Sequence, residues 1–397
     1  MERILAIDYS VLSYQAFFGM KSSSWECRTN VEVQEYARGL AHRLYYLKQV
    51  IQPTKVIMAM DSYPIWRNKV YDDYYKKNTK YFKCNYTETS GENVSERECY
   101  LLEYDKKVYS VYFSKIKDEW ICHKPKKADL EIIMSGDVWQ YVESKEVDPD
   151  TQISMTELPE NMSGFLPAYK GNRKDAKWPY SLTKKEYKEL SGKIVKNISG
   201  LMCDDVDIVY GLDAEADDVL TYYINNNSEK DVFMYTVDTD LDQLAIRNMF
   251  LKIVRPKGPD SIEIVDRTVE SIKYDLMKKI LAGDSSDNIA GVSLKDKSTC
   301  LSDKGAEKFL TRFEDDTSKI YPALKEEADS EPLERNLKLI YLDNIPNYVK
   351  EHIQESLDNP IKPKDGFNWK DFGLEDSDML TLRSKAKEDR KELELEN

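Results

Sequence analysis

The sequence predicts an α/β protein with a central, mostly parallel sheet flanked by helices. Apolar runs over residues 3–7 and 55–60 have the length of buried strands, and apolar side chains recur at helical spacing over 31–52. A strand, a helix and a second strand within the first 60 residues indicate a βαβ unit, in which the two strands run parallel. The same alternation returns after residue 182, so we expect both segments to contribute to one sheet.

The elements of the second segment follow in order along the chain. The pattern of apolar residues predicts a helix over 182–198, a strand over 206–210, a helix over 217–225, a strand over 232–237, a strand pair over 250–254 and 262–265, and a helix over 269–281. Gly258 and Pro259 mark the turn of the strand pair, and Gly283 ends the last helix.

The remaining regions give the predicted domain organisation. Residues 1–78 and 166–320 form the core, and 79–165 carry β-favouring runs separated by charged turns, which predicts an antiparallel, β-rich insertion. Residues 321–397 form a helical C-terminal region, with its best amphipathic stretch over 333–357. The last residues, 385–397, are almost all charged, and we expect a fraying helix or tail there.

Composition excludes several classes of protein. The chain has 397 residues, 41% of them hydrophobic, which is too rich for a disordered protein and sufficient for a sizeable core. No run approaches the ~20 apolar residues of a membrane span, and residues 1–10 do not resemble a signal peptide. The six cysteines form no Cys-x-x-Cys pair and the three histidines are far apart. We therefore expect a cytoplasmic monomer that contacts no membrane.

Acidic residues stand where the predicted strands end. Asp8, Asp61 and Asp238 each follow a buried strand, and ligand sites of parallel sheets lie beyond the carboxyl ends of the strands. Six more acids lie on the predicted helix starts and turns close to that edge: Glu215, Asp217, Asp218, Asp240, Asp284 and Asp287. Single members have ordinary explanations, because acids cap helix N-termini and occupy turns.

The number of these acids points to metal ions. Nine carboxylates at one edge would repel one another without a counter-charge. Hard oxygen ligands without a histidine cluster favour Mg²⁺ or Mn²⁺, and two such ions together are suited to hydrolysing a phosphodiester. The acids therefore predict metal-dependent phosphoryl hydrolysis.

The acidic segments resemble, in order, the motifs of the flap endonuclease/5′-3′ exonuclease family. They are Leu5–Asp8, Met60–Asp61, Glu215–Asp218, Asp238–Asp240 and Gly283–Asn288. Within the family the chain is most similar to phage 5′ nucleases of the RNase H type, to which segments 66–78 and 336–346 are also similar. The resemblance leaves the insertion unexplained.

This resemblance implies a PIN-like 5′ nuclease core with a helical arch and two Mg²⁺ ions, with Mn²⁺ as a substitute. It implies that the first ion is held by Asp8, Asp61, Asp218 and Asp238, with Glu215 and Asp217 nearby, and the second by Asp240, Asp284 and Asp287. It also implies 5′-end-directed hydrolysis of RNA–DNA hybrids and of 5′-ended or flapped DNA, which in a phage-infected bacterium would remove RNA primers during DNA replication.

A basic segment precedes the acidic one. Residues 166–199 hold nine Lys and Arg against three acids, whereas residues 201–240 hold eleven acids and one base. Segment 169–174 resembles the family's Tyr-Lys-x-Asn-Arg motif at the base of the arch, and cations interleaved with aromatic rings suit a single-strand path. The predicted nucleic-acid contacts are Tyr169, Lys174, Lys177, Lys184, Lys185 and Lys188, unless this is only a solvated amphipathic helix.

Two lysines compete for the catalytic position. Lys170 has Arg173 after it, whereas the partial copy at 75–78 offers Lys76 but lacks the arginine. We favour Lys170, with Arg67 assisting from the other side of the insertion. The family's duplex-binding element after Asp287 matches only partly, and Lys304 at a helix start could meet a phosphate there.

Two alternatives stay open at the level of sequence. The chain could be a non-catalytic relative that binds branched DNA or replication proteins, or a PIN-like ribonuclease. The insertion and the C-terminal region carry no readable chemistry, and they could bind a single-strand-binding protein, a clamp or more DNA.

Overall fold

A computed structural model gives the fold. It describes residues 2–18, 30–90, 93–114, 119–123, 153–156, 164–171, 184–198, 206–258, 260–297, 299–313, 319–361, 370, 374–393 and 395. The chain divides into two compact units: the first unit is Met1–Trp66, Lys174–Met277 and Ile340–Asn397, and the second unit is Arg67–Arg173 and Lys278–Leu339. Within the described residues, no helix is long and apolar enough to cross a membrane.

The first unit is built on a six-stranded sheet with the order β11-β10-β9-β1-β2-β8. Its strands are β1 (Arg3–Asp8), β2 (Lys55–Met60), β8 (Val206–Tyr210), β9 (Asp231–Tyr235), β10 (Leu251–Gly258) and β11 (Ser261–Ile264). All neighbours pair parallel except β10 and β11, which correspond to the predicted strand pair and run antiparallel. The predicted α/β class with a mostly parallel sheet is confirmed.

Strand β1 is central because both of its edges are paired. Leu5 lies opposite Val56 of β2 on one side and Phe233 of β9 on the other. Residues 4–8 of β1 are buried, as expected of a strand covered on both faces. This arrangement puts the carboxyl ends of β1, β2 and β9 at one edge of the sheet.

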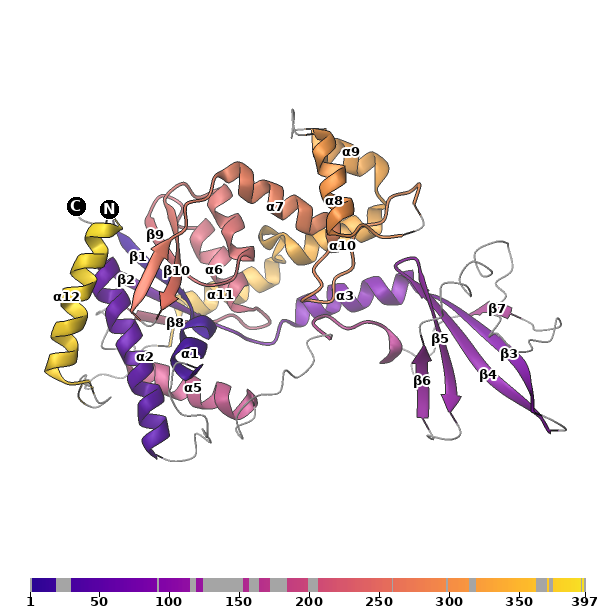
Figure 1. Ribbon diagram of the computed structural model, residues 1–397, viewed down its shortest axis with the longest axis horizontal. Helices are drawn as coiled ribbons and strands as arrows, with labels where there is room; N and C mark the ends of the chain where they lie inside the picture. The colour runs from indigo at the N-terminus through magenta and orange to yellow at the C-terminus, as the bar shows by residue number, and fades with distance from the viewer. Residues whose placement is uncertain are drawn as a thin grey trace. The chain divides into compact units, whose positions relative to one another are not determined.

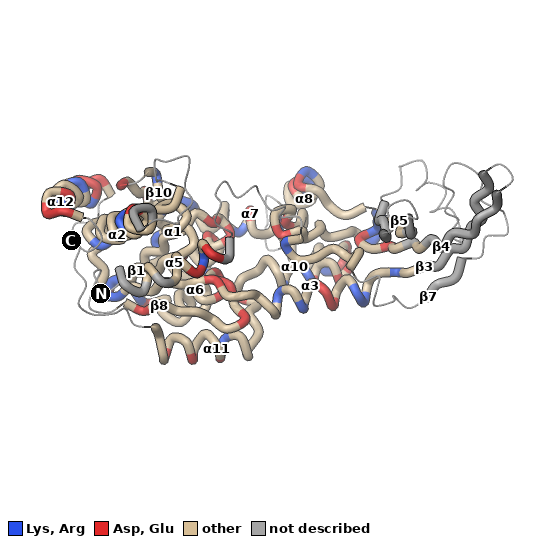
Figure 2. The backbone as a smooth tube through the Cα atoms, turned by 90° about the horizontal axis from the view of Figure 1, so that it is seen from below, with Lys and Arg blue, Asp and Glu red and all other residues tan. Residues whose placement is uncertain are grey.

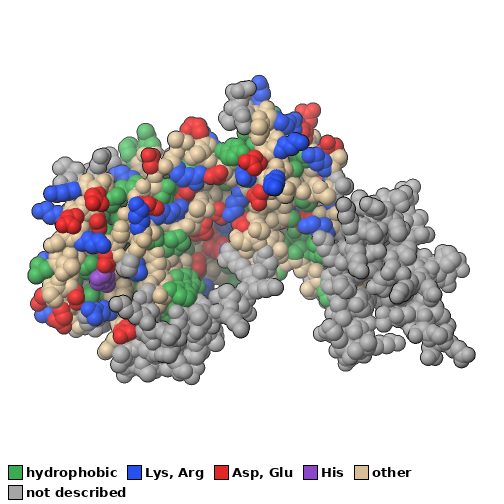
Figure 3. All heavy atoms as spheres, viewed as in Figure 1, with side chains coloured by type: hydrophobic (Ala, Val, Ile, Leu, Met, Phe, Trp, Pro, Cys, Tyr) green, Lys and Arg blue, Asp and Glu red, His purple; other side chains and the backbone are tan. Residues whose placement is uncertain are grey.

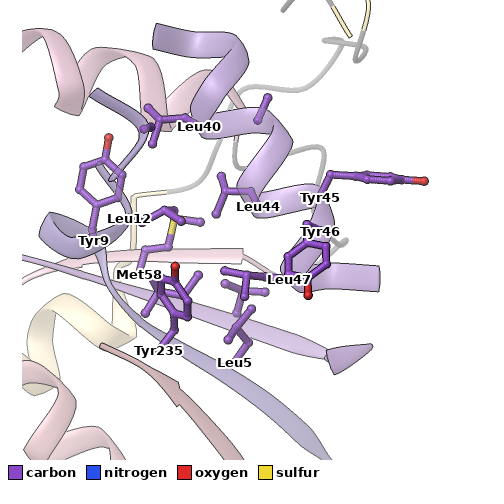
Figure 4. Close-up of a cluster of buried hydrophobic side chains, with 14 of the residues drawn as sticks. Leu5, Tyr9, Leu12, Leu40, Leu44, Tyr45, Tyr46, Leu47, Met58 and Tyr235 are labelled. Atoms are coloured by element: carbon purple, nitrogen blue, oxygen red, sulfur yellow. The ribbon is translucent and has the colours of Figure 1, made fainter. Parts of the chain in front are cut away.

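One face of the sheet carries the main core of the first unit. The helices on this face are α1 (Tyr9–Phe18), α2 (Asn30–Ile51), α5 (Lys184–Ile198) and α12 (Asp376–Glu392). Leu5, Met58 and Tyr235 of the sheet pack against Leu40 and Leu44 of α2 (Figure 4). On the other face, α6 (Ala216–Asn225) packs on β1 and β2, and α11 (Asn347–Asp358) packs on β8.

The last helix corrects part of the prediction of a fraying helix or tail, because residues 385–392 are helical but belong to a helix that packs on the core. Helix α12 packs against α2 and buries Met379, Leu382 and Ala386 among its many charges. Basic and acidic residues are interspersed along it (Figure 2). Ion pairs such as Arg38 to Asp378, at 3.1 Å, lie at its edge. Three buried side chains in seventeen residues are too sparse a pattern to find by periodicity.

The predicted amphipathic stretch 333–357 is not one helix. It is divided between α10 (Ser330–Ile340) and α11, with a 3₁₀ turn at Leu342–Asn344 between them. Pro346 is the N-cap of α11. Proline has no amide hydrogen to donate inside a helix and disfavours helical backbone at the residue before it, so one helix does not continue through this position.

The second unit holds the β-rich segment. Its five-stranded antiparallel sheet has the order β6-β5-β4-β3-β7, with strands β3 (Lys80–Ser90), β4 (Asn93–Tyr104), β5 (Lys107–Ser114), β6 (Glu119–His123) and β7 (Ile153–Thr156). The helices lying wholly or mainly in this unit are α3 (Ile65–Asn78), α8 (Asp303–Leu310), α9 (Ile320–Glu327) and α10. Helix α7 (Val269–Ala282) begins in the first unit and ends in the second. A strand expected over 130–134 lies outside the described residues.

Candidate active site

The acids of the first unit begin with Asp8 at the end of β1. Its side chain is only 5% exposed, so its charge is largely removed from water. Oδ1 accepts hydrogen bonds from the backbone N of Ser10 at 3.0 Å and from its Oγ at 2.7 Å. Thr236, which follows β9, donates to Oδ2 at 3.5 Å. These bonds hold the carboxylate at the sheet edge.

Asp61, directly after β2, joins this edge to helix α6. Its Oδ1 accepts a hydrogen bond from the backbone N of Ala216 at 3.2 Å, at the start of that helix. The next residue, Ser62, donates its N to the carbonyl of Ala214 at 3.0 Å. The loops that follow the neighbouring strands β2 and β8 are therefore tied together, and Asp61 itself is exposed.

The two acids in the first turn of α6 have different surroundings. Asp218 is fully buried and forms a capping box with Glu215, whose backbone N donates to Asp218 at 3.0 Å. Trp66 donates its Nε1 to the same carboxylate oxygen at 3.2 Å. Asp217 is instead affected by the charges of other acids. No pattern in the sequence shows which of these two acids takes part in the capping box.

Several acids affect the pKa values of Asp8 and Asp217. Burial, with the charges of Asp61 and Asp238 acting in the same direction, raises the pKa of Asp8 to about 6, although the bonds from Ser10 oppose this. Burial raises the pKa of Asp217 well above its usual value. Four carboxylates add to that rise, namely Asp238, Asp8, Glu215 and Asp61. We call Asp8, Asp61, Glu215, Asp217 and Asp238 the acid cluster.

The segment after β9 is held by a partly buried arginine. Arg255 donates its Nη1 to the carbonyls of Thr236 at 2.9 Å and Asp238 at 3.0 Å, and its Nη2 to Asp242. Asp242 also accepts from Arg267 at 3.0 Å. Within the segment, the N of Asp240 donates to Asp238 Oδ1 at 2.8 Å. This network fixes the backbone from which Asp238 and Asp240 project.

The donor chemistry of the acid cluster fits a hard divalent cation. All of its side-chain donors are carboxylate oxygens, which Mg²⁺ and Mn²⁺ prefer. Across the part of the chain that the structure describes, however, no three or more His, Cys, Asp or Glu side chains are grouped so that they could hold an ion. Because Mg²⁺ keeps several of its waters and needs only one or two protein carboxylates, a looser arrangement is compatible with it.

The predicted acids Asp284 and Asp287 lie in the second unit. Asp284 accepts hydrogen bonds from the N of Ser286 at 2.8 Å and its Oγ at 2.7 Å, and pairs with Lys279 at 2.8 Å. Although burial acts in the opposite direction, these contacts lower the pKa of Asp284. The assignment of Asp284 and Asp287 as ligands of a second ion stays a prediction.

The basic residues have unequal surroundings. Lys170 is partly buried beside Asp287, whereas Lys76 is exposed in the last turn of α3. Arg67 is buried and donates to the carbonyl of Leu339 at 2.6 Å, so it stabilises α10 in the second unit. Lys304 is exposed in the first turn of α8, a helix that Ser302 caps through the N of Gly305.

The rest of the predicted basic path is only partly described. Lys188 is exposed on α5. Arg173, Lys174 and Lys177 lie outside the described residues, as do the side chains of Lys184 and Lys185. Over the visible face of the first unit, Lys and Arg are interspersed with Asp and Glu (Figure 3). The arch and its contacts therefore stay predictions.

Four residues next to the acids were not predicted. Ser10 stands two residues after Asp8, a spacing at which a short polar side chain commonly bonds to the acid, so this pair could have been found. Trp66, Arg255 and Asp242 reach their partners across 152, 17 and 13 residues, and no local pattern indicates such contacts.

No protein-family model and no curated protein matches the chain. Solved structures do match it, among them three of bacteriophage T5 proteins. The first, a T5 protein co-crystallised with metal ions, has 12% identity and a TM-score of 0.41, covering 98% of this chain and 100% of that one. A T5 flap endonuclease complex with DNA and metal ions has 13% identity and a TM-score of 0.43, covering 96% and 100%.

The third is a T5 5′-exonuclease with zinc bound, at 11% identity and a TM-score of 0.42, covering 98% of this chain and 100% of that one. The chain is thus similar, at these values, to solved structures of phage flap endonucleases and 5′-exonucleases.

Proposed function

We propose that this protein is a metal-dependent 5′ nuclease that hydrolyses phosphodiesters of RNA–DNA hybrids and of 5′-ended or flapped DNA. The observation that carries the proposal is the acid cluster. Five acids follow the strands at the carboxyl edge of a parallel sheet, and burial together with their charges raises the pKa values of Asp8 and Asp217. A fold tolerates such repulsion when a cation neutralises it.

Asp8, Asp61, Asp217 and Asp238 would hold the divalent ion, with Glu215 at its edge. Asp218 is engaged by the helix cap and by Trp66, so its contribution would be to fix the start of α6. When bound, Mg²⁺ ions would activate water and neutralise the developing charge on the phosphate. Arg255 would hold the carbonyl of Asp238, and Asp240 would be held in turn by its backbone hydrogen bond to Asp238.

Basic residues would supply the rest of the site. Lys170 would place its ammonium against a phosphate, and Lys188 with the basic residues before it would guide the 5′ strand. The assignment of Asp240, Asp284 and Asp287 to a second ion stays a prediction from the sequence. In a phage-infected bacterium, the substrate would be the RNA primer of a newly made DNA fragment, which carries a 5′ end on an RNA–DNA hybrid.

Cleavage assays on defined substrates test this proposal. The purified protein is incubated with a 5′-labelled DNA flap and with a 5′-labelled RNA–DNA hybrid, in Mg²⁺, in Mn²⁺ or in EDTA. We expect short 5′ products with either ion and none in EDTA. Binding of the flap without cleavage in either ion would favour a non-catalytic DNA-binding protein. Cleavage of single-stranded RNA alone would favour a PIN-like ribonuclease.

A further inference from the structure

Buried hydroxyl groups meet where three helices of the first unit come together. Two belong to α1, one to α2 and two to α5, and none of these residues is more than 3% exposed: Tyr9, Ser13, Tyr36, Tyr187 and Ser191. The two members on α1 are one helical turn apart, as are the two on α5, so each pair lies on one face of its helix. We call these residues the hydroxyl cluster.

Ser191 of α5 contacts both of the other helices. The hydroxyl of Tyr9, the first residue of α1, donates to the carbonyl of Ser191 at 2.9 Å and lies 2.7 Å from its Oγ. The hydroxyl of Tyr36 on α2 donates to the same Oγ at 2.9 Å. One serine of α5 is therefore hydrogen-bonded to α1 and to α2 at once.

Ser13 of α1 makes the corresponding contacts in the other direction. Its Oγ lies 2.5 Å from the hydroxyl of Tyr36 and 2.7 Å from that of Ser191, and it is also hydrogen-bonded to Tyr187. The ring of Tyr187 packs against Phe17 of α1, with 4.8 Å between the centroids. Each hydroxyl has one proton to donate, and a buried hydroxyl without a partner is costly. The cluster is therefore satisfied only when all three helices are in place.

The hydroxyl cluster holds α5 at the edge of the sheet where the acid cluster lies. Tyr9 directly follows Asp8 in the chain, so the bond from its hydroxyl fixes α5 relative to that acid. Gly192 of α5 approaches the end of β2 closely. A Cβ at this glycine would lie 3.8 Å from the Cε of Met60, the residue before Asp61. The position of α5 is thus defined against the ends of β1 and β2.

Helix α5 also carries part of the predicted path of the 5′ strand. Lys188 follows Tyr187 directly, and its side chain is exposed. A strand bound along this helix would present one of its phosphates to the acid cluster. Successive phosphates of one strand are only ~3.4 Å apart along the axis of a duplex, so a shift of α5 by a few ångströms would bring a neighbouring phosphodiester to the acids.

We propose that the hydroxyl cluster fixes α5 against α1 and thereby sets which phosphodiester of the 5′ strand is hydrolysed. The inference rests on the proposed function. It makes Ser13 and Ser191 positioning residues, since both are buried and act through the helix rather than on the substrate. Hydrogen bonds have a defined length and direction and so specify one position of the helix, whereas hydrophobic burial is non-directional.

The test compares Ser191→Ala, Ser13→Ala and the double variant with the wild type and with the control Tyr45→Phe. Alanine is a good helix former, so the serine variants keep both helices. Tyr45 is another buried tyrosine of α2, but its hydroxyl accepts a hydrogen bond from Arg383 of α12 and does not belong to the hydroxyl cluster. The readouts are hydrogen exchange over α5 and the lengths of the products from a 5′-labelled flap in Mg²⁺, resolved to one nucleotide.

We expect faster hydrogen exchange over α5 in both serine variants. The ratio of the main product to its neighbours should fall roughly 10-fold, because a misplacement of about 1 Å strongly slows a reaction that depends on position. Ser13 and Ser191 contact each other, so the double variant should resemble the single variants rather than show the sum of their effects. Tyr45→Phe should keep the exchange over α5 and the product lengths of the wild type.

The outcomes separate this inference from the proposed function. If the wild type cleaves the flap and Ser191→Ala cuts it at the same phosphodiester with the same precision, the inference is overturned and the proposed function stands. Unchanged hydrogen exchange over α5 in both serine variants would also overturn the inference. Absence of cleavage by the wild type would overturn the proposed function, and with it the selection of a phosphodiester.

Discussion

The hydroxyl group of Tyr169 donates a hydrogen bond to Oδ2 of Asp287 at 3.0 Å, within the second unit. The ammonium of Lys170 lies 3.9 Å from the same oxygen, and the N of Lys170 donates to the carbonyl of Asp287 at 2.9 Å. Lys170 has a φ of 58°, so these contacts hold a strained turn. The segment that carries the predicted catalytic lysine is thereby fastened to a predicted metal ligand.

The variant Tyr169→Phe should weaken metal binding at Asp287. It removes the hydroxyl that orients the carboxylate but keeps the buried ring, and loss of such an orienting bond typically lowers metal affinity roughly 10-fold or more. Mn²⁺ binding followed by electron paramagnetic resonance measures this. Tyr321→Phe, on the exposed surface of α9, is the control. An unchanged Mn²⁺ affinity would show that Tyr169 does not orient Asp287.

The variants Lys170→Ala and Lys76→Ala should differ strongly. Lys170 is held beside Asp287 and Lys76 is exposed, so we expect kcat/KM to fall roughly 100-fold for the first and by less than about 3-fold for the second. Single-turnover cleavage of the flap measures both. Lys170→Gly relieves the strained φ, so it should be at least as stable as the wild type and equally impaired. Equal, mild effects of both alanines would contradict the assignment of Lys170.

The acid cluster should make stability depend on pH and on metal. The pKa of Asp8 rises from 3.8 to about 6 on folding, so between these values the native protein binds more protons than the unfolded chain. The contribution of Asp8 to the free energy of unfolding of the metal-free protein should therefore fall as the pH rises from about 4 to about 6. Asp8→Asn should remove it and should stabilise the metal-free protein above about pH 6.

Adding Mg²⁺ or Mn²⁺ should reverse this effect. An ion that binds the ionised cluster stabilises the native state, and more so at about pH 7.5 than at about pH 5, where protons compete for Asp8 and Asp217. Thermal unfolding in EDTA and in excess Mg²⁺ at both pH values measures the difference. A gain in unfolding temperature that is the same at both pH values, or that survives in Asp8→Asn, would count against binding at the cluster.

Arg255 should contribute to stability and to the position of Asp238. It pairs with buried Asp242 and bonds to two carbonyls, so Arg255→Ala should lower the free energy of unfolding by about 3 kcal/mol. Urea unfolding measures the loss. Lys257→Ala, which removes an exposed ion pair on the same strand, should cost less than about 1 kcal/mol. Comparable losses for both variants would show that the buried network does not stabilise the segment.

The sequence predicted the sheet well because its strands are apolar runs bounded by acids or glycine. Strands β1, β2 and β8 match the predicted ranges within one residue, and both faces of these strands are buried. The packing of helix α12 on the core was not predicted because its buried face is small. The break before α11 was not predicted either, although Pro346 signals it.

The candidate site was only partly predictable, because some of its contacts follow from the sheet topology and others are long-range hydrogen bonds. Strand ends in a parallel sheet place Asp8, Asp61 and Asp238 at one edge, which follows from topology. Which acid of the pair Asp217 and Asp218 faces the others depends on the capping box and on Trp66, a contact across 152 residues. Long-range hydrogen bonds of this kind leave no local pattern.

The most direct test is cleavage of a 5′-labelled flap in Mg²⁺ by the wild type, Asp8→Ala, Asp238→Ala and the control Asp231→Ala. Asp231 lies at the opposite end of β9 from Asp238, where it pairs with Arg3 and Lys252. We expect the two cluster variants to lose cleavage but to bind the flap with nearly wild-type affinity, and Asp231→Ala to retain activity. Normal cleavage by Asp8→Ala or Asp238→Ala would contradict the proposed metal-dependent nuclease site.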